Sequence, residues 1–79
     1  MKTIDNPEYK LLIDLLKETR TTKSITQIEL AERLGLDQTY ISKYETLERR
    51  IDLVELKAIC RALGISMTKF VEDYETRLK

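Results

Sequence analysis

The chain has 79 residues, with 14 basic and 14 acidic side chains, one cysteine and no histidine. This length fits one domain, and no apolar stretch approaches the roughly 20 residues that a membrane-spanning helix needs. The lack of histidine removes the usual general base and the commonest zinc ligand, and a single cysteine suits a reducing cytoplasm. The composition therefore predicts no enzyme, no metal, no cofactor, no membrane partner and a cytoplasmic location. Since the net charge is zero, nucleic-acid binding has to be argued from local charge.

The N-terminal part of the chain has the apolar spacing of a helix face. Asn6 is a common N-cap residue, and Pro7 fits the first helical position because the amide that proline lacks has no partner there. Steps of three and four residues then predict a helix over 7–21, with these residues on its inner face: Leu12, Leu15, Leu16 and Thr19.

Two short helices are predicted next. Thr26 and Glu29 have the spacing of a capping box, in which each side chain bonds the other residue's backbone amide, and a helix is expected over 27–34. Gly35 ends it, because glycine easily adopts the left-handed conformation. Asp37 is the expected cap of a helix over 38–46. The residues expected to face inward are Ile28, Leu30, Ala31, Leu34, Leu36, Ile41 and Tyr44.

The remaining sequence predicts two more helices. Asp52 and Glu55 repeat the capping-box spacing before a helix over 53–63, which Gly64 ends, and Ser66 caps a helix over 67–78. Cys60 is interpreted as a small core residue and not a redox sensor, because no neighbour is evident that would lower its pKa. The expected inward residues are Leu56, Ile59, Cys60, Leu63, Phe70 and Val71. The whole chain, 1–79, is thus predicted to be one all-α domain of five helices.

Residues 26–45 carry the most information about function. A short helix, a three-residue turn opened by Gly35 and a second short helix, with small Ala31 where the two helices cross, form a helix-turn-helix pattern. The string ITQIELAERLGLDQTYISKYE, over 25–45, resembles the usual form LTQxxLAxxLGVxQxYISxxE of the Cro and lambda-repressor-like (Xre) family. LKAICRALGIS, over 56–66, is similar to that family's fourth helix and its cap. The resemblance covers about residues 10–73. It implies a lambda-repressor-like fold and a sequence-specific, repressor-like transcriptional regulator.

The helix over 38–46 is expected to read DNA. In such motifs the second helix enters the major groove, where each base pair presents a distinct pattern of donors and acceptors. By the resemblance, Gln38, Thr39 and Lys43 occupy the positions that contact bases. Gln38 can bond adenine through two atoms, Lys43 can donate to guanine, and Thr39 offers a hydroxyl and a methyl group. The alternative is that these side chains form an ordinary solvated face.

Further residues are expected at the sugar-phosphate backbone: Gln27, Tyr40, Ser42, Arg49 and Arg50. Gln27 begins a helix, where free amides favour phosphate. Tyr40 has the alternative of lying against its own helix, and the two arginines that of pairing with Glu48 and Asp52. Acidic residues in the same region and the zero net charge predict weaker non-specific binding than that of a basic homologue.

Arg20 and Glu45 match a family pair that joins the first helix to the third, and we interpret them as structural. The chain departs from the family pattern at Thr19, where leucine is usual, and at Ser24, where glycine is usual. The loop over 47–52 lacks the frequent glycine and proline, which leaves its conformation and its phosphate contacts open.

The expected partner is a double-stranded DNA operator bound by a homodimer, because a dimer places two reading helices about 34 Å apart on one face of the DNA. Phe70, Val71 and Tyr74 are the candidate dimer surface, unless they complete the core of the monomer. No small-molecule ligand is expected, since no sensor domain accompanies the motif. A protein-binding adaptor or an antitoxin-like domain is the alternative function.

Overall fold

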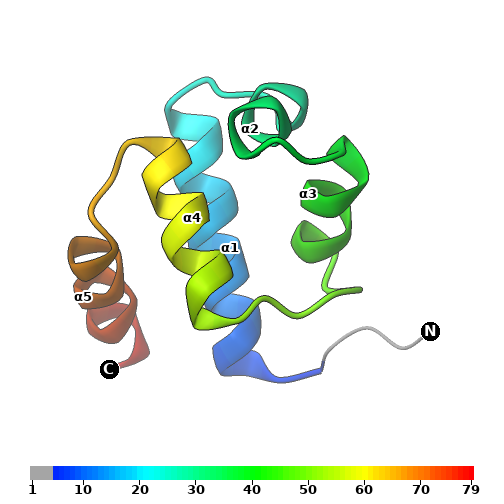
Figure 1. The fold of residues 1–79 in the computed structure, drawn as a ribbon. Coiled ribbons are helices and arrows are strands. Elements are labelled where there is room, and N and C mark those ends of the chain that lie inside the picture. The colour runs from blue at the N-terminus through cyan, green and yellow to red at the C-terminus, as the bar shows by residue number, and fades with distance from the viewer. Residues whose placement is uncertain (1–4) are drawn as a thin grey trace.

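The computed structural model describes residues 5–79, and these form five α-helices and no strand. The helices are α1 (Pro7–Thr22), α2 (Gln27–Leu34), α3 (Gln38–Glu45), α4 (Leu53–Leu63) and α5 (Met67–Leu78). The all-α prediction is confirmed, and the predicted bounds differ from the observed ones only where α1 and α3 end. Figure 1 shows α1 behind the other helices, with α3 and α5 on opposite sides and α4 between them. No helix in the described part of the chain is long and apolar enough to cross a membrane.

Every helix begins at the cap that the sequence predicts. The Asn6 side chain accepts the Tyr9 amide at 2.9 Å. Both capping boxes are formed: Thr26 and Glu29 exchange hydrogen bonds of 2.9 and 3.0 Å, and Asp52 and Glu55 exchange bonds of 2.8 and 2.7 Å. Because these bonds satisfy amides that have no partner within the helix, short helices such as α2 have defined starts.

The core is built from residues of all five helices and of the segment between α1 and α2. Its buried apolar residues are Ile13, Leu15, Leu16, Ile25, Leu30, Ala31, Ile41, Tyr44, Leu56, Ile59, Cys60, Leu63 and Phe70. Leu12, Thr19, Leu34 and Val71, which were expected to face inward, are half-buried.

Two predictions about the core are wrong. Ile28 is 54% exposed and Leu36 is 46% exposed. Ile28 lies two positions before Leu30, which is about 200° around a helix with 3.6 residues per turn, so both cannot face the core. Leu36 lies in the turn after Gly35, where its side chain remains largely in solvent. Ile13 and Ile25 are buried although the spacing did not select them.

Cys60 and Tyr44 lie fully inside the core. Cys60 is 1% exposed, and burial raises the pKa of its thiol to about 11, which is the opposite of what a reactive thiol needs. The interpretation of Cys60 as a core residue is confirmed. The Tyr44 hydroxyl is also buried and has no hydrogen-bond partner among the described residues.

Ser24 adopts a left-handed conformation with φ +58°. This conformation costs a residue with a side chain about 1–2 kcal/mol, and Ser24 is exposed and stands where the family usually has glycine. We predict that Ser24→Gly stabilises the chain by about 0.5–1 kcal/mol and raises the melting temperature by several degrees. Thermal unfolding followed by circular dichroism measures this. The control Ser24→Ala should give no gain, and a less stable glycine variant would contradict the prediction.

Candidate nucleic-acid interface

The turn between α2 and α3 is fixed by backbone geometry. Gly35 has φ +70°, and its amide bonds the last turn of α2. The Leu36 amide donates to the Ala31 carbonyl at 2.9 Å, and the Asp37 side chain then accepts the Thr39 amide at 3.0 Å. Ala31 is 2% exposed, since α2 and α3 pack closely against each other. The helix-turn-helix predicted from the sequence is therefore present, with α3 in the position of the reading helix.

The three predicted base readers lie on the exposed side of α3. Gln38, Thr39 and Lys43 are exposed, whereas Ile41 and Tyr44 on the opposite side are 0% exposed. The Thr39 hydroxyl donates to Asp37 at 3.0 Å, which fixes the hydroxyl proton and leaves the oxygen lone pairs and the methyl group available. The two bonds from Thr39 also lower the pKa of the Asp37 carboxyl, so Asp37 remains charged at the start of α3.

A buried ion pair joins α1 to the end of α3. Arg20 Nε donates to Glu45 Oε2 at 2.7 Å, and a second guanidinium nitrogen donates to Oε1 at 3.0 Å. The third nitrogen donates to the Ile25 carbonyl at 2.8 Å. The two side chains are 9% and 2% exposed. The two residues that the sequence paired are therefore in contact, and a fork of this geometry sets orientation as well as distance.

The same carboxylate begins a hydrogen-bond chain that ends at the reading face. Gln27 Nε2 donates to Glu45 Oε1 at 2.9 Å, and Gln38 Nε2 donates to Gln27 Oε1 at 3.2 Å. Gln38 thereby uses one amide hydrogen, and within residues 5–79 no hydrogen bond engages its carbonyl oxygen or its other amide hydrogen. An acceptor and a donor on one amide are the groups through which a glutamine can pair with adenine in the major groove.

Tyr40 and Ser42 are half-buried beside this face. The Tyr40 ring meets the Tyr44 ring edge-on at 5.8 Å between centroids, and the Arg49 guanidinium lies 4.6 Å from the Tyr40 centroid. Burial, and next the charge of Glu55, raises the pKa of Tyr40 to about 12. The Tyr40 ring is thus packed within the domain.

The two loop arginines have different surroundings. Arg49 pairs with Glu55 at 2.8 Å and not with Glu48 or Asp52, which were the partners considered from the sequence. The Arg50 guanidinium lies over the Tyr9 ring, 5.2 Å from its centroid, and has no carboxylate partner among the described residues.

Tyr9 also holds the loop backbone, because its hydroxyl accepts the Ile51 amide at 3.0 Å. Sequence reasoning missed Tyr9, and no local pattern could have found it, since the two residues are 42 positions apart. Glu55 was predicted only as part of the capping box of α4. In the structure it also forms an ion pair with Arg49.

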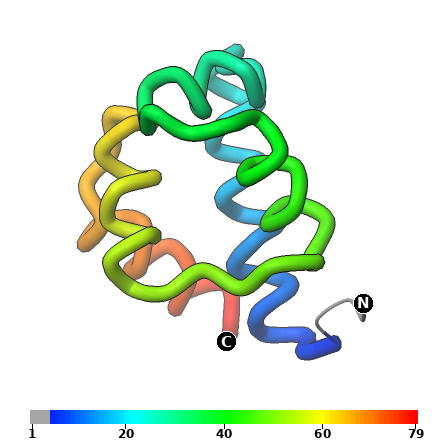
Figure 2. Tube along the Cα trace, turned by 45° about the vertical axis from the view of Figure 1, so that its right-hand side comes forward, coloured from blue at the N-terminus to red at the C-terminus, as the bar shows by residue number. Residues whose placement is uncertain are grey.

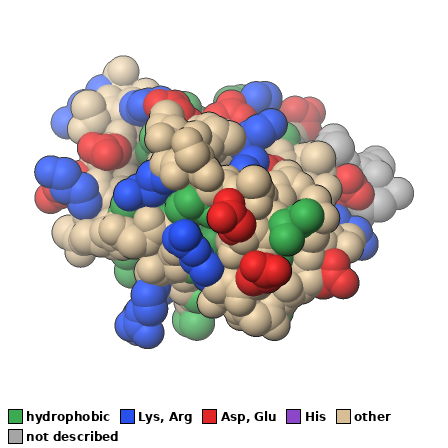
Figure 3. All heavy atoms as spheres, turned by 90° about the horizontal axis from the view of Figure 1, so that it is seen from above, with side chains coloured by type: hydrophobic (Ala, Val, Ile, Leu, Met, Phe, Trp, Pro, Cys, Tyr) green, Lys and Arg blue, Asp and Glu red, His purple; other side chains and the backbone are tan. Residues whose placement is uncertain are grey.

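The surface charge is mixed. Figure 3 shows basic and acidic side chains interspersed over the face of the molecule seen from above. This agrees with the zero net charge of the sequence. Within residues 5–79, no three histidine, cysteine, aspartate or glutamate side chains gather in a way that could hold a metal ion.

Comparisons with known proteins place this geometry in a family. A family model described as Helix-turn-helix matches residues 16–70. The control protein C.MunI from Mycoplasma sp is 36% identical over 61 residues, which cover 76% of this chain and 82% of that protein. An XRE-family like protein from Pseudomonas syringae pv. tomato str. DC3000 superposes with a TM-score of 0.88 at 40% identity, over 94% of this chain and 90% of that one.

A further structure is that of the restriction-modification controller protein C.Esp1396I, a tetramer in complex with its natural 35 base-pair operator. It superposes with a TM-score of 0.86 at 30% identity, over 95% of this chain and 100% of that one. The fold and the comparisons together define the protein class as DNA-binding transcriptional regulators. The chain belongs to the helix-turn-helix family, and the Xre-like resemblance is confirmed.

Removing one partner of the buried ion pair should destabilise the fold. Arg20→Ala leaves the Glu45 carboxylate buried without its cation, which costs about 3 kcal/mol or more. The melting temperature should fall by roughly 10 °C or more. The control Lys10→Ala breaks the Lys10–Asp14 pair, whose side chains are 60% and 57% exposed, and should change little. An unchanged melting curve for Arg20→Ala would show that the pair contributes nothing to stability.

The Glu55 carboxyl predicts a pH dependence of stability. Its hydrogen bonds with Arg49 and with the Asp52 amide lower its pKa below the ordinary 4.5. A carboxyl whose pKa is lower in the folded state stabilises the fold above the unfolded-state pKa, and this contribution is lost as the pH falls. Glu55→Gln should therefore cost about 1 kcal/mol at pH 7 and progressively less below about pH 4.5. Urea unfolding from pH 7 to pH 3 tests this, and a difference independent of pH would refute it.

Proposed function

We propose that this regulator binds a specific DNA operator as a homodimer and reads the major groove with the N-terminal half of α3. The main support is the exposed face of Gln38, Thr39 and Lys43, on which Gln38 is held through Gln27 by the buried Glu45. A side chain oriented before binding loses less conformational freedom when it meets a base. In this proposal Gln38 reads adenine, Lys43 donates to guanine and Thr39 contacts a neighbouring base.

Backbone contacts would surround this reading face. We assign Gln27, at the first position of α2, and Ser42 and Tyr40, beside the reading face, to sugar-phosphate contacts, which set register without reading sequence. Of the two loop arginines, we assign Arg50 to a phosphate, because its guanidinium has no carboxylate partner among residues 5–79. Arg49 is held by Glu55 and Tyr40, and its main contribution is to keep the loop in place.

The proposed context is a compact, repressor-like regulator that acts in the cytoplasm on DNA upstream of its own gene. The similarity to controller proteins such as C.MunI, over most of their length, supports it. We assign it no enzymatic reaction.

The sequence predicted a dimer surface on α5 formed by Phe70, Val71 and Tyr74. Phe70 is 3% exposed and belongs to the monomer core, while Tyr74 is half-buried and its hydroxyl donates to the Glu8 carbonyl at 2.7 Å. Val71 and the outer side of α5 are therefore the parts of α5 that remain for a partner.

Fluorescence anisotropy with the DNA upstream of the gene tests the proposal. The titration is run across a salt series and against a random-sequence competitor. We expect binding that survives the competitor, and footprinting of the same duplex should show two protected half-sites one helical turn apart. Weak binding that ignores sequence and collapses with salt would contradict the proposal and favour the alternative of a protein partner.

Truncation of the reading side chains should weaken binding without affecting the fold. Gln38→Ala and Lys43→Ala should each cost about 1–3 kcal/mol of operator affinity, because each removes a contact to a base edge. Lys17→Ala, an exposed cation on α1, is the control and should bind as the wild type does. Equal affinity for all three variants would exclude α3 as the reader.

Substitution of the two loop arginines should have different effects on the salt dependence of DNA binding and on stability. Arg50→Ala should lower the slope of log affinity against log salt by about 0.9, since one phosphate contact is lost. It should cost no more stability than its cation–π contact with Tyr9 supplies, about 0.5–1 kcal/mol. Arg49→Ala should chiefly lower the melting temperature, because it removes the partner of Glu55. An unchanged slope for Arg50→Ala would remove Arg50 from the DNA interface.

A further inference from the structure

Tyr9, in the first turn of α1, contacts the loop that follows α3. Figure 2 shows this loop passing beside the start of α1. The Tyr9 hydroxyl accepts the Ile51 amide at 3.0 Å and lies 3.5 Å from the Arg49 carbonyl oxygen. These two groups belong to the peptide bonds on either side of Arg50. One side chain from α1 therefore contacts the main chain both before and after Arg50.

The Tyr9 ring holds the side chain of Arg50 as well. The Arg50 guanidinium lies over this ring, 5.2 Å from its centroid. Arg50 is exposed, and no carboxylate among residues 5–79 pairs with it. A guanidinium carries five N–H donors, and contact with the face of a ring uses none of them. The ring thus restrains the guanidinium and leaves its donors for an acceptor outside the domain.

Arg49 uses its donors in a different way. One guanidinium nitrogen donates to the Arg50 carbonyl at 3.0 Å, and the other terminal nitrogen pairs with Glu55 at 2.8 Å. Both contacts lie within the domain, and the first fixes the main chain of Arg50 once more. The loop therefore has one arginine that fastens it and a second that is held in place with its donors directed to no carboxylate of the described chain.

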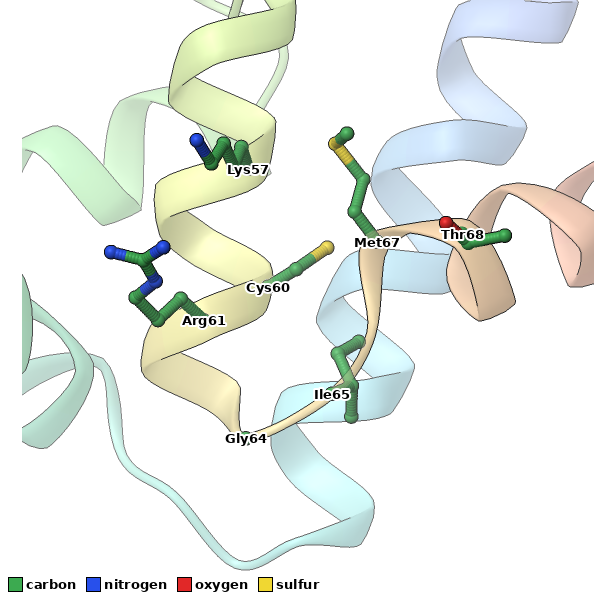
Figure 4. Close-up of a pocket in the computed structure, with 7 residues that line it drawn as sticks. All are labelled: Lys57, Cys60, Arg61, Gly64, Ile65, Met67 and Thr68. Carbon is green, nitrogen blue, oxygen red and sulfur yellow. The ribbon is translucent and has the colours of Figure 1, made fainter.

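Arg61 on α4 is an arginine without such support. It is exposed, and Figure 4 shows it extending from α4 beside a hollow that Met67 and Thr68 also line. Within the described residues, no carboxylate pairs with Arg61 and no aromatic ring lies against it. Arg50 and Arg61 are thus alike in exposure and in the lack of a carboxylate partner, and they differ in the ring of Tyr9.

We propose that Tyr9 is a positioning residue for DNA binding, which holds the Arg50 guanidinium in the orientation that meets a backbone phosphate. This inference rests on the proposed function, in which Arg50 contacts a phosphate. An arginine loses conformational freedom when a phosphate fixes it, and a side chain that is already oriented loses less. The first turn of α1 then contributes to DNA affinity through Arg50, without a contact of its own to DNA.

The orientation of Arg50 is tested first without DNA. NMR relaxation of the arginine Nε–Hε groups compares Arg50 with Arg61 in the wild type, in Tyr9→Leu and in Tyr9→Phe. In the wild type, Arg50 should be ordered on the picosecond-to-nanosecond timescale and Arg61 mobile. Tyr9→Leu should make Arg50 as mobile as Arg61, whereas Tyr9→Phe keeps the ring and should keep most of the order. Equal mobility of Arg50 and Arg61 in the wild type would overturn the proposal, even if Tyr9→Leu fails to fold.

A double-mutant cycle then measures the effect on DNA binding. The upstream DNA duplex is titrated with the wild type, Tyr9→Leu, Arg50→Ala and the chain that carries both changes. Tyr9→Leu should weaken binding roughly two- to tenfold for each protomer, the loss expected when one long side chain has to be immobilised on binding. In the Arg50→Ala background it should cause no further loss. An equal loss in both backgrounds would make Tyr9 a general structural residue and overturn the proposal.

The same titrations separate this inference from the proposed function. If Arg50 is ordered but Arg50→Ala leaves the affinity and the salt slope unchanged, Arg50 contacts no phosphate and the positioning role of Tyr9 is wrong. Gln38→Ala still measures whether α3 reads the bases, because its effect does not depend on the loop. A wild type that shows no preference for the upstream duplex would refute the proposed function, and the inference with it.

Discussion

The ion pair between Arg20 and Glu45 is the interaction on which the arrangement of the motif depends. It crosses from α1 to the last residue of α3 and also holds the Ile25 carbonyl, just before α2. Burying two charges is costly, and once both are buried the removal of either partner is strongly destabilising. The contacts of Arg20 link α1 to the end of α3 and to the segment just before α2. Through Gln27, the same carboxylate reaches Gln38 at the exposed start of α3.

The loop after α3 is held by a different kind of contact. Leu47 has φ +67°, a conformation that favours glycine, and the tyrosine and arginine contacts around the loop maintain it. Tyr9 bonds the Ile51 amide, and Arg49 lies between Tyr40 and Glu55. A loop without glycine or proline is thus ordered by residues from α1, α3 and α4. The reading helix is supported at both of its ends, by Asp37 before it and by this loop after it.

The features that the sequence predicted are mostly local. Caps such as Thr26 with Glu29 act over three residues, and their residue types identify them directly. The Arg20–Glu45 pair is not local, and it was predicted only because the chain resembles a family that has it. The contacts of Tyr9 with the loop and of Arg49 with Glu55 were not predicted, because they depend on the way distant segments pack. Ile28 was misplaced for a related reason, since an eight-residue helix gives too few apolar positions to fix its inner side.

The central claim is that α3, oriented through Gln27 and Glu45, meets the bases. NMR titration of the isotope-labelled chain with its upstream DNA duplex tests this most directly, because the side-chain amides of Gln27 and Gln38 give separate signals. The account predicts that these amides and the backbone signals of Thr39 and Lys43 shift most on binding. Shifts confined to α4 and α5, with the two glutamine amides unchanged, would contradict it.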